Sequence, residues 1–385
     1  MQVLSISLSL IPSVRFSGKE LLMNNIQNLA QLGQSIWYDN IQRKMLINGG
    51  LQTMIDQGLL GMTSNPTIFE KAISGSSDYD AALQQLAAHG ATVEQIYDAL
   101  TIEDVGMAAD LFRPVFERTH GKDGYVSIEV SPHLAHDTAG TLADARRLWA
   151  TLKRPNVMIK IPATKEGLPA IEQALTDGIN VNVTLMFSMA HYMAVAEAYL
   201  CALEARAQAR QAIDHVASVA SFFVSRVDTM LDSKLQQAGA TELLGKAAVA
   251  NSQLVYARYL EIFGGPRFKA LADRGARVQR VLWASTSVKN PAYPDLLYVD
   301  NLIGPETVNT VPPETYEAIL DHAEVARTVD RDLKTAQQIV ADLRAHGFDL
   351  DETGEQLSVE GVEKFSKSFD GLLRVIEQKR AALGG

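Results

Sequence analysis

The sequence predicts a (β/α)8 TIM barrel, a closed ring of eight parallel strands surrounded by helices, with additional C-terminal helices. Eight short apolar runs alternate with longer segments of helical periodicity, and repeated strand–helix units imply parallel strands joined by right-handed crossovers. No glycine-rich nucleotide fingerprint follows the first run and no Walker A pattern is present, which disfavours an open doubly wound sheet. We expect the strands at residues 35–38, 60–63, 125–130, 157–161, 180–185, 216–222, 280–284 and 307–310.

Helical periodicity fills the segments between these strands and continues after the last one. The connection between the second and third strands is long, so extra helices are expected within residues 79–117. At the C-terminus, residues 332–345 and 359–382 are amphipathic and should pack outside the barrel or partly cover its mouth. Gly347 is expected to end the first of these helices, with a linker at 348–356 between them. The apolar face of the last helix is expected to comprise Val359, Val362, Phe365, Phe369, Leu372 and Ile376.

The composition predicts one globular domain. Of the 385 residues, 47% are hydrophobic, and (β/α)8 barrels of this size occur as single units. We assign residues 23–385 to one barrel domain and residues 1–22 to an N-terminal extension, to which the sequence gives no role. The apolar start of this extension lacks the preceding basic residues and the small-residue cleavage site of a secretory signal.

Charge and cysteine usage exclude several functions. The net charge of −10 disfavours binding to nucleic acid or to an anionic membrane, and no stretch approaches the roughly 20 apolar residues of a membrane-spanning helix. The single cysteine, Cys201, excludes internal disulfides and cysteine-based metal sites and is typical of a reducing compartment. We therefore expect a cytoplasmic protein with no nucleic-acid or membrane partner; its oligomeric state is left open.

Lys160 is the most informative residue, because it interrupts the apolar run at residues 157–162. In a strand that is buried on both faces an unpaired ammonium is costly, and burial lowers its pKa. A lysine with a lowered pKa is a nucleophile near neutral pH and can form a Schiff base with a carbonyl group. The alternative is a lysine that extends to the strand end or pairs with a carboxylate.

Other polar side chains stand within or directly after the predicted strands, where the active sites of barrel enzymes lie. Glu129, Asn182 and Thr184 interrupt apolar runs, and Asp39 follows the first strand. Asn182 and Thr184 are two residues apart, so they face the same side of their strand. If that side is the interior, an amine, two carboxylates, an amide and a hydroxyl converge, as Schiff-base chemistry requires. The alternatives are structural hydrogen bonds and a buried salt bridge between Glu129 and Lys160.

Two cations are expected at the mouth of the barrel. Arg226 and Lys289 follow the sixth and seventh strands, where many barrels bind a phosphate group. Considered one at a time, each is more simply explained as a charged side chain exposed to solvent. His133 and His136 follow the third strand, but no third ligand is apparent. We interpret them as loop histidines and expect no metal site.

Six segments of the sequence, in this order, resemble the transaldolases, and most closely the longer bacterial type. The resemblance covers most of the chain, from about residue 24 to about residue 380. It implies a TIM barrel without metal or organic cofactor. It also implies transfer of a three-carbon dihydroxyacetone unit in the non-oxidative pentose phosphate pathway, from sedoheptulose 7-phosphate or fructose 6-phosphate to glyceraldehyde 3-phosphate or erythrose 4-phosphate. The segments are TSNP (63–66), IEV (128–130), VMIKIPAT (157–164), INVNVTL (179–185), WASTSVKNP (283–291) and DNLIGP (300–305).

The resemblance also implies a role for each site residue. Lys160 would form the Schiff base, and Asp39 would be the general acid/base for cleavage and formation of the C3–C4 bond. Glu129, together with Thr184, would hold a water molecule that relays protons. The implied substrate-binding residues are Asn65 and Asn182 for the dihydroxyacetone hydroxyls, and Ser221, Arg226 and Lys289 for the phosphate.

Two positions bear on the choice of function. Lys289 stands where many transaldolases have an arginine, and a lysine binds phosphate as a point charge, without the fork of a guanidinium. Phe223 lies near a position at which related enzymes that release free dihydroxyacetone have a tyrosine; phenylalanine lacks the hydroxyl that would position a water, which favours transfer. The alternatives are a Schiff-base aldolase of the fructose-6-phosphate aldolase type and a non-catalytic sugar-phosphate-binding barrel.

Overall fold

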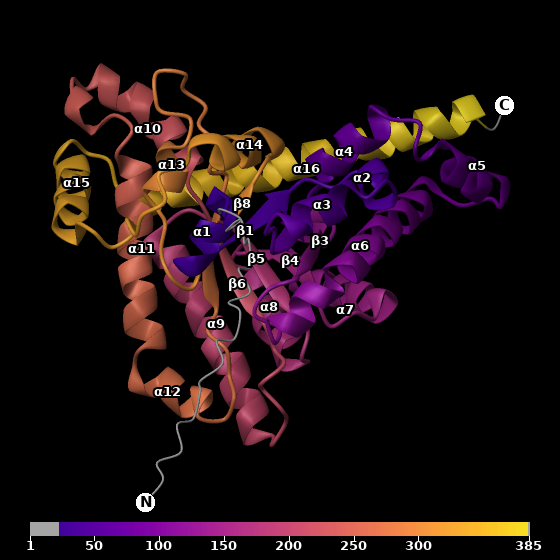
Figure 1. The fold of residues 1–385 in the computed structure, drawn as a ribbon, viewed down its shortest axis with the longest axis horizontal. Helices are drawn as coiled ribbons and strands as arrows, with labels where there is room; N and C mark the ends of the chain where they lie inside the picture. Colours follow the sequence, from indigo (N-terminus) through magenta and orange to yellow (C-terminus); the bar gives the residue numbers. More distant parts are fainter. Residues whose placement is uncertain (1–22, 384–385) are drawn as a thin grey trace, which may run out of the picture.

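The structure, a computed structural model, describes residues 23–383; the predicted N-terminal extension at 1–22 lies outside these residues. Eight parallel strands close into a barrel in chain order (Figure 1), which confirms the predicted fold. Every strand begins and ends within two residues of its predicted bounds. The strands are β1 Gln34–Asp39, β2 Gly61–Thr63, β3 Val126–Glu129, β4 Val157–Pro162, β5 Val181–Met186, β6 Ser218–Phe223, β7 Arg280–Ala284 and β8 Thr307–Val311.

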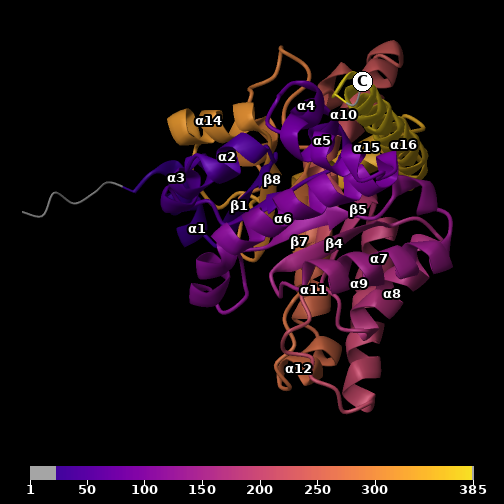
Figure 2. The same cartoon turned by 90° about the vertical axis from the view of Figure 1, so that its right-hand side faces the viewer.

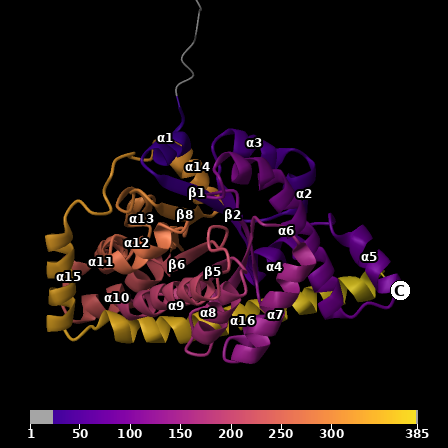
Figure 3. The same ribbon diagram turned by 90° about the horizontal axis from the view of Figure 1, so that it is seen from below.

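Helices cover the outer face of the barrel, as Figures 2 and 3 show from two further sides. Two of them, α5 and α6, account for the extra helical segment predicted between β2 and β3, and α6 begins with a capping box between Thr92 and Gln95. Within residues 23–383, no helix combines the length and the apolar character needed to cross a bilayer. The helices are α1 Asn25–Gln31, α2 Arg43–Ile47, α3 Gly50–Asp56, α4 Pro66–Ser74, α5 Asp80–Ala88, α6 Val93–Arg118, α7 Thr138–Leu152, α8 Gly167–Thr176, α9 Met189–Gln208, α10 Ser225–Gln237, α11 Ala247–Phe263, α12 Pro266–Ala272, α13 Leu297–Asp300, α14 Pro313–His322, α15 Leu333–Ala345 and α16 Leu350–Leu383.

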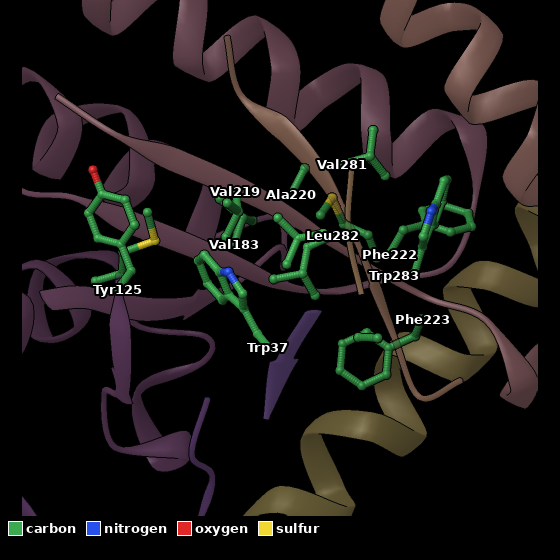
Figure 4. Packing of buried hydrophobic residues seen from close by; sticks show 14 of the residues in the cluster. Trp37, Tyr125, Val183, Val219, Ala220, Phe222, Phe223, Val281, Leu282 and Trp283 are labelled. Atoms are coloured by element: carbon green, nitrogen blue, oxygen red, sulfur yellow. The ribbon is translucent and has the colours of Figure 1, made fainter. Parts of the chain in front are cut away.

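The strands are apolar because both of their faces are packed. Strands β4, β5 and β6 are buried at every position, as expected for parallel strands between a barrel interior and a layer of helices. Figure 4 shows part of this packing, in which the rings of Phe222 and Trp283 meet edge to face with centroids 6.3 Å apart. A polar group in such surroundings requires a partner, which is why the polar strand residues are informative.

A buried ion pair closes the N-terminal end of the barrel. The carboxylate of Asp123 accepts hydrogen bonds from Arg280 at 2.8 Å, Trp37 at 3.0 Å and Ser35 at 2.9 Å. The side chains of Arg280 and Asp123 are each 5% exposed. These polar groups are fully partnered and lie at the end of the barrel opposite to the site described below, so we interpret them as structural.

The C-terminal helices correct two predictions. Gly347 ends α15 with a φ of +85°, as expected, but the predicted linker at 348–356 is mostly helical, because α16 begins at Leu350. Val359 is wrongly placed on the apolar face, since it is 57% exposed, whereas the other five predicted positions are buried. Helix α16 contacts α4, α5, α6 and α9 and runs the length of the molecule (Figures 1 and 3).

Candidate active site

A cavity of about 1010 Å³ opens at the C-terminal ends of the strands. Its walls are formed by strand ends and by residues of α4, α10 and α16. All the predicted site residues line it except Glu129, whose carboxylate lies just behind the wall beside Lys160. The lining residues predicted from the sequence are Asp39, Asn65, Lys160, Asn182, Thr184, Ser221, Arg226 and Lys289.

The amine of Lys160 is held inside the barrel mouth. The residue is 5% exposed, and its Nζ donates a hydrogen bond to the backbone oxygen of Ser64 at 2.8 Å. Nζ also lies 3.6 Å from Oε2 of Glu129, which is too long for a direct hydrogen bond. Lys160 pairs in register with Glu129 on β3 and with Asn182 on β5. The alternative of a lysine extended to solvent is therefore wrong, and the amine faces the cavity with a carboxylate near it.

Two buried oxygens beside this amine have no protein partner within the described residues. They are Oε2 of Glu129 and Oγ1 of Thr184. Burial raises the pKa of the Glu129 carboxyl above its ordinary value, the charge of Lys160 opposes this rise, and the nearby Thr184 contributes a smaller lowering. A carboxyl with a raised pKa can both donate and accept a proton near neutral pH.

The second carboxylate, Asp39, stands at the end of β1. Its Oδ1 accepts a hydrogen bond of 2.6 Å from the hydroxyl of Thr63, which is also within 2.6 Å of the hydroxyl of Thr310. Burial raises the pKa of Asp39, and the charge of Lys160 and the Thr63 hydrogen bond oppose the rise. Asp39 thus presents a second proton-transferring group to the same cavity.

Asn182 is fixed by hydrogen bonds to a side chain of β3 and a side chain of β6. Its Nδ2 donates to Oγ of Ser127 at 3.1 Å, and its Oδ1 accepts from the hydroxyl of Ser221 at 2.6 Å. Asn65 is positioned differently, as the residue that caps α4, where its Oδ1 accepts from the backbone N–H of Ile68 at 3.0 Å. Both amides are therefore held in place before any ligand binds.

Cations surround another part of the cavity. Arg226, near the start of α10, lies over the ring of Phe223 at 5.4 Å, and burial lowers the pKa of its guanidinium. Lys289 donates a hydrogen bond to Oγ of Ser287, which also lines the cavity. Ser287 was not among the predicted site residues, although its place two residues before Lys289 was a usable signal.

Two further cations of the cavity, Lys71 on α4 and Lys364 on α16, were also missed. No sequence signal identifies them, because a lysine on an amphipathic helix resembles any solvated charge.

The two loop histidines each contact a carboxylate: His133 lies 2.9 Å from Asp370, and His136 lies 3.0 Å from Glu166. Residues 23–383 contain no group of three or more histidine, cysteine, aspartate or glutamate side chains placed to hold a metal ion.

A buried lysine beside two carboxylates, at the C-terminal mouth of a (β/α)8 barrel, is the arrangement of enzymes that form a Schiff base with a carbonyl substrate. Comparison with known proteins agrees. The model of the family described as Transaldolase/Fructose-6-phosphate aldolase matches residues 36–376. The chain therefore belongs to the transaldolase/fructose-6-phosphate aldolase family.

Several curated relatives match over almost their whole length. The transaldolase of Saccharopolyspora erythraea is 49% identical over 92% of this chain and 98% of its own. The transaldolase of Mycobacterium ulcerans is 48% identical and that of Trichodesmium erythraeum 45% identical, each over 93% of this chain and 98% of its own. The similarity therefore includes the barrel and the C-terminal helices.

Proposed function

We propose that this protein is a transaldolase. It would transfer a dihydroxyacetone unit from sedoheptulose 7-phosphate to glyceraldehyde 3-phosphate, which gives erythrose 4-phosphate and fructose 6-phosphate. The observation that carries the proposal is the amine of Lys160, which is buried at the cavity wall 3.6 Å from the Glu129 carboxylate. Family membership and the relatives' printed name support the same reaction.

The first half of the reaction forms the Schiff base. The Lys160 amine attacks the C2 carbonyl of the ketose, and the resulting carbinolamine loses water to give an iminium. A proton must reach the departing hydroxyl, and a water held between Oε2 of Glu129 and Oγ1 of Thr184, which have no partner among the described residues, would deliver it. Asn182 and Asn65 would hold the dihydroxyacetone hydroxyls, since the cap bond of Asn65 leaves its amide nitrogen to donate into the cavity.

The second half breaks and remakes a carbon–carbon bond. Asp39 takes the proton from the C4 hydroxyl as the C3–C4 bond breaks, the aldose leaves, and the electron pair remains on the three-carbon unit as an enamine. The enamine C3 then attacks the aldehyde of the acceptor, and Asp39 returns the proton to the new alkoxide. The raised pKa of Asp39 suits a group that must carry a proton in both directions.

Arg226 and Lys289 would bind the substrate phosphate. Both line the cavity, and a guanidinium with an ammonium provides charge-assisted hydrogen bonds to a phosphate. Ser221 was assigned to the same group, but its hydroxyl donates to Asn182; we propose Ser287, which contacts Lys289 directly, as an additional hydroxyl for the phosphate. We also propose that residues 23–385 act as one domain, in the cytoplasm and without nucleic acid.

A test of this function is to trap the intermediate. Borohydride reduction in the presence of fructose 6-phosphate should attach a three-carbon unit covalently to Lys160, which peptide mass spectrometry locates. Lys160→Ala should abolish labelling and turnover, while Lys165→Ala, which changes an exposed lysine on the following turn, should keep both. Wild-type turnover in the Lys160→Ala protein would refute the mechanism.

A second candidate is an aldolase that releases free dihydroxyacetone. The side chain at the cavity wall beside Arg226 is Phe223, which has no hydroxyl to position a water for protonating the enamine. This favours transfer over release. Turnover of fructose 6-phosphate should therefore require the acceptor aldehyde erythrose 4-phosphate; release of dihydroxyacetone without an acceptor would instead support the aldolase. Binding of fructose 6-phosphate with no trappable adduct would indicate a non-catalytic barrel.

A further inference from the structure

Four cationic side chains line one part of the cavity: Arg226, Lys289, Lys364 and Lys71. Among the residues that the structure describes, none of the four forms a salt bridge. Unneutralised like charges in one cavity repel each other, so the cluster is suited to binding an anion.

Lys364 lies within the field of the other three cations. Arg226 is the largest cause of a lowered pKa at Lys364, followed by partial burial and by smaller contributions from Lys289 and Lys71. An anion that binds between these groups would relieve their mutual repulsion. Lys364 is thus electrostatically part of the Arg226–Lys289 pair, although it comes from a different element, α16.

The helix that carries Lys364 is held close to the barrel mouth. A Cβ atom added to Gly361 would lie 2.9 Å from Cδ2 of Leu185 and 3.7 Å from Nη1 of Arg226. A larger residue at this position would require the Leu185 side chain or the helix to shift, because the first distance is shorter than real Cβ contacts. One turn of helix separates Gly361 from the neighbouring lysine, so α16 presents Lys364 to the cavity in a fixed position.

The same helix face also carries one negative charge. Glu360 lies four residues before Lys364 and lines the same cavity. Its side chain accepts a hydrogen bond of 2.8 Å from Gln356. Burial lowers the pKa of Arg226, and the charge of Glu360 partly opposes that lowering. Glu360 is therefore near enough to the cluster to oppose an incoming anion, whereas Lys364 attracts one.

We propose that α16 contributes to the phosphate site, with Lys364 as a third cationic ligand of the substrate phosphate and Glu360 as an opposing charge that limits how tightly the phosphate binds. The ligand class is a phosphate monoester dianion. The proposal rests on the proposed function only in taking this phosphate to be that of a sugar substrate. Lys364 acts on binding and takes no part in the proton transfers.

Titration with inorganic phosphate at low ionic strength, followed by phosphorus NMR, tests the proposal without requiring turnover. Loss of one nearby cation should weaken binding about fivefold to tenfold in Lys364→Gln, and Lys364→Arg should restore most of the affinity. Glu360→Gln should bind phosphate more tightly than the wild type. Lys367→Gln is the matched control, because Lys367 lies on the same helix, is highly exposed and pairs with Glu363.

Equal phosphate affinity in wild-type and Lys364→Gln proteins of the same thermal midpoint would overturn the inference. So would a Glu360→Gln protein that binds phosphate more weakly. Steady-state kinetics separate this result from the proposed function: Lys364→Gln should raise KM for fructose 6-phosphate while kcat stays close to the wild-type value. If the wild type binds phosphate through Lys364 but shows no turnover, the inference stands and the transaldolase proposal fails.

Discussion

Neutralising Asp123 should destabilise the barrel strongly while leaving the chemistry of the folded enzyme intact. In Asp123→Asn the side-chain shape is kept, but the guanidinium of Arg280, 5% exposed, loses its counter-charge. Breaking one side of a buried ion pair costs about 3–5 kcal/mol. At about 2.1 cal/mol/K per residue, the unfolding entropy of 385 residues is about 0.8 kcal/mol/K, so the thermal midpoint should fall by about 4–6 °C.

Urea unfolding followed by tryptophan fluorescence measures the effect, because Trp37 donates a hydrogen bond to Asp123. Asp110→Asn is the matched control: Asp110 pairs with Arg154 at 2.7 Å, but the two side chains are 63% and 33% exposed. An exposed pair contributes less than about 1 kcal/mol. If both variants lose the same stability, burial is not what makes the Asp123 pair important, and the reasoning is refuted.

Two further predictions concern pH and the placement of α16. Burial raises the pKa of Asp228 to about 7, so the folded state binds this proton more tightly than the unfolded state. The wild type should lose at most about 4 kcal/mol of stability as pH rises from about 4 to 7, and Asp228→Asn should not; a stability difference between the two proteins that is constant with pH would contradict this. Gly361→Val should push α16 away from Leu185 and raise KM for phosphorylated sugars; an unchanged KM would show that this contact does not position the helix.

Much of the fold and the position of the candidate site could be predicted because burial makes polar residues conspicuous. Lys160 and Asn182 each interrupt a strand that is mostly apolar, and a polar group in such surroundings requires a partner. Asp39 was found from its place at a strand end, since parallel strands bring their C-terminal ends to one edge. The register of β3, β4 and β5 then brings the predicted groups together.

The contribution of α16 could not be predicted, because it depends on how one long helix lies on the barrel. Residues 348–356 resembled a linker because they are mostly polar, yet Leu350 and Leu357 are buried. Val359 comes three residues before Val362, but at about 100° per residue it lies well to one side of the direction that the other five positions share, and it is 57% exposed. Lys364 has the pattern of a solvated lysine, and only the docking of the helix at Gly361 places it at the cavity.

The path of α16 has a consequence for how the barrel comes apart. The helix contacts α4, α5 and α6, which precede β4 in the chain, and also α9 and α10, which follow β5. Through these contacts on the outside of the barrel, α16 connects early and late segments of the chain. The part of the barrel before β4 cannot separate from the part after β5 unless the contacts of α16 break. We therefore expect both parts to unfold in a single cooperative transition, with no half-barrel intermediate.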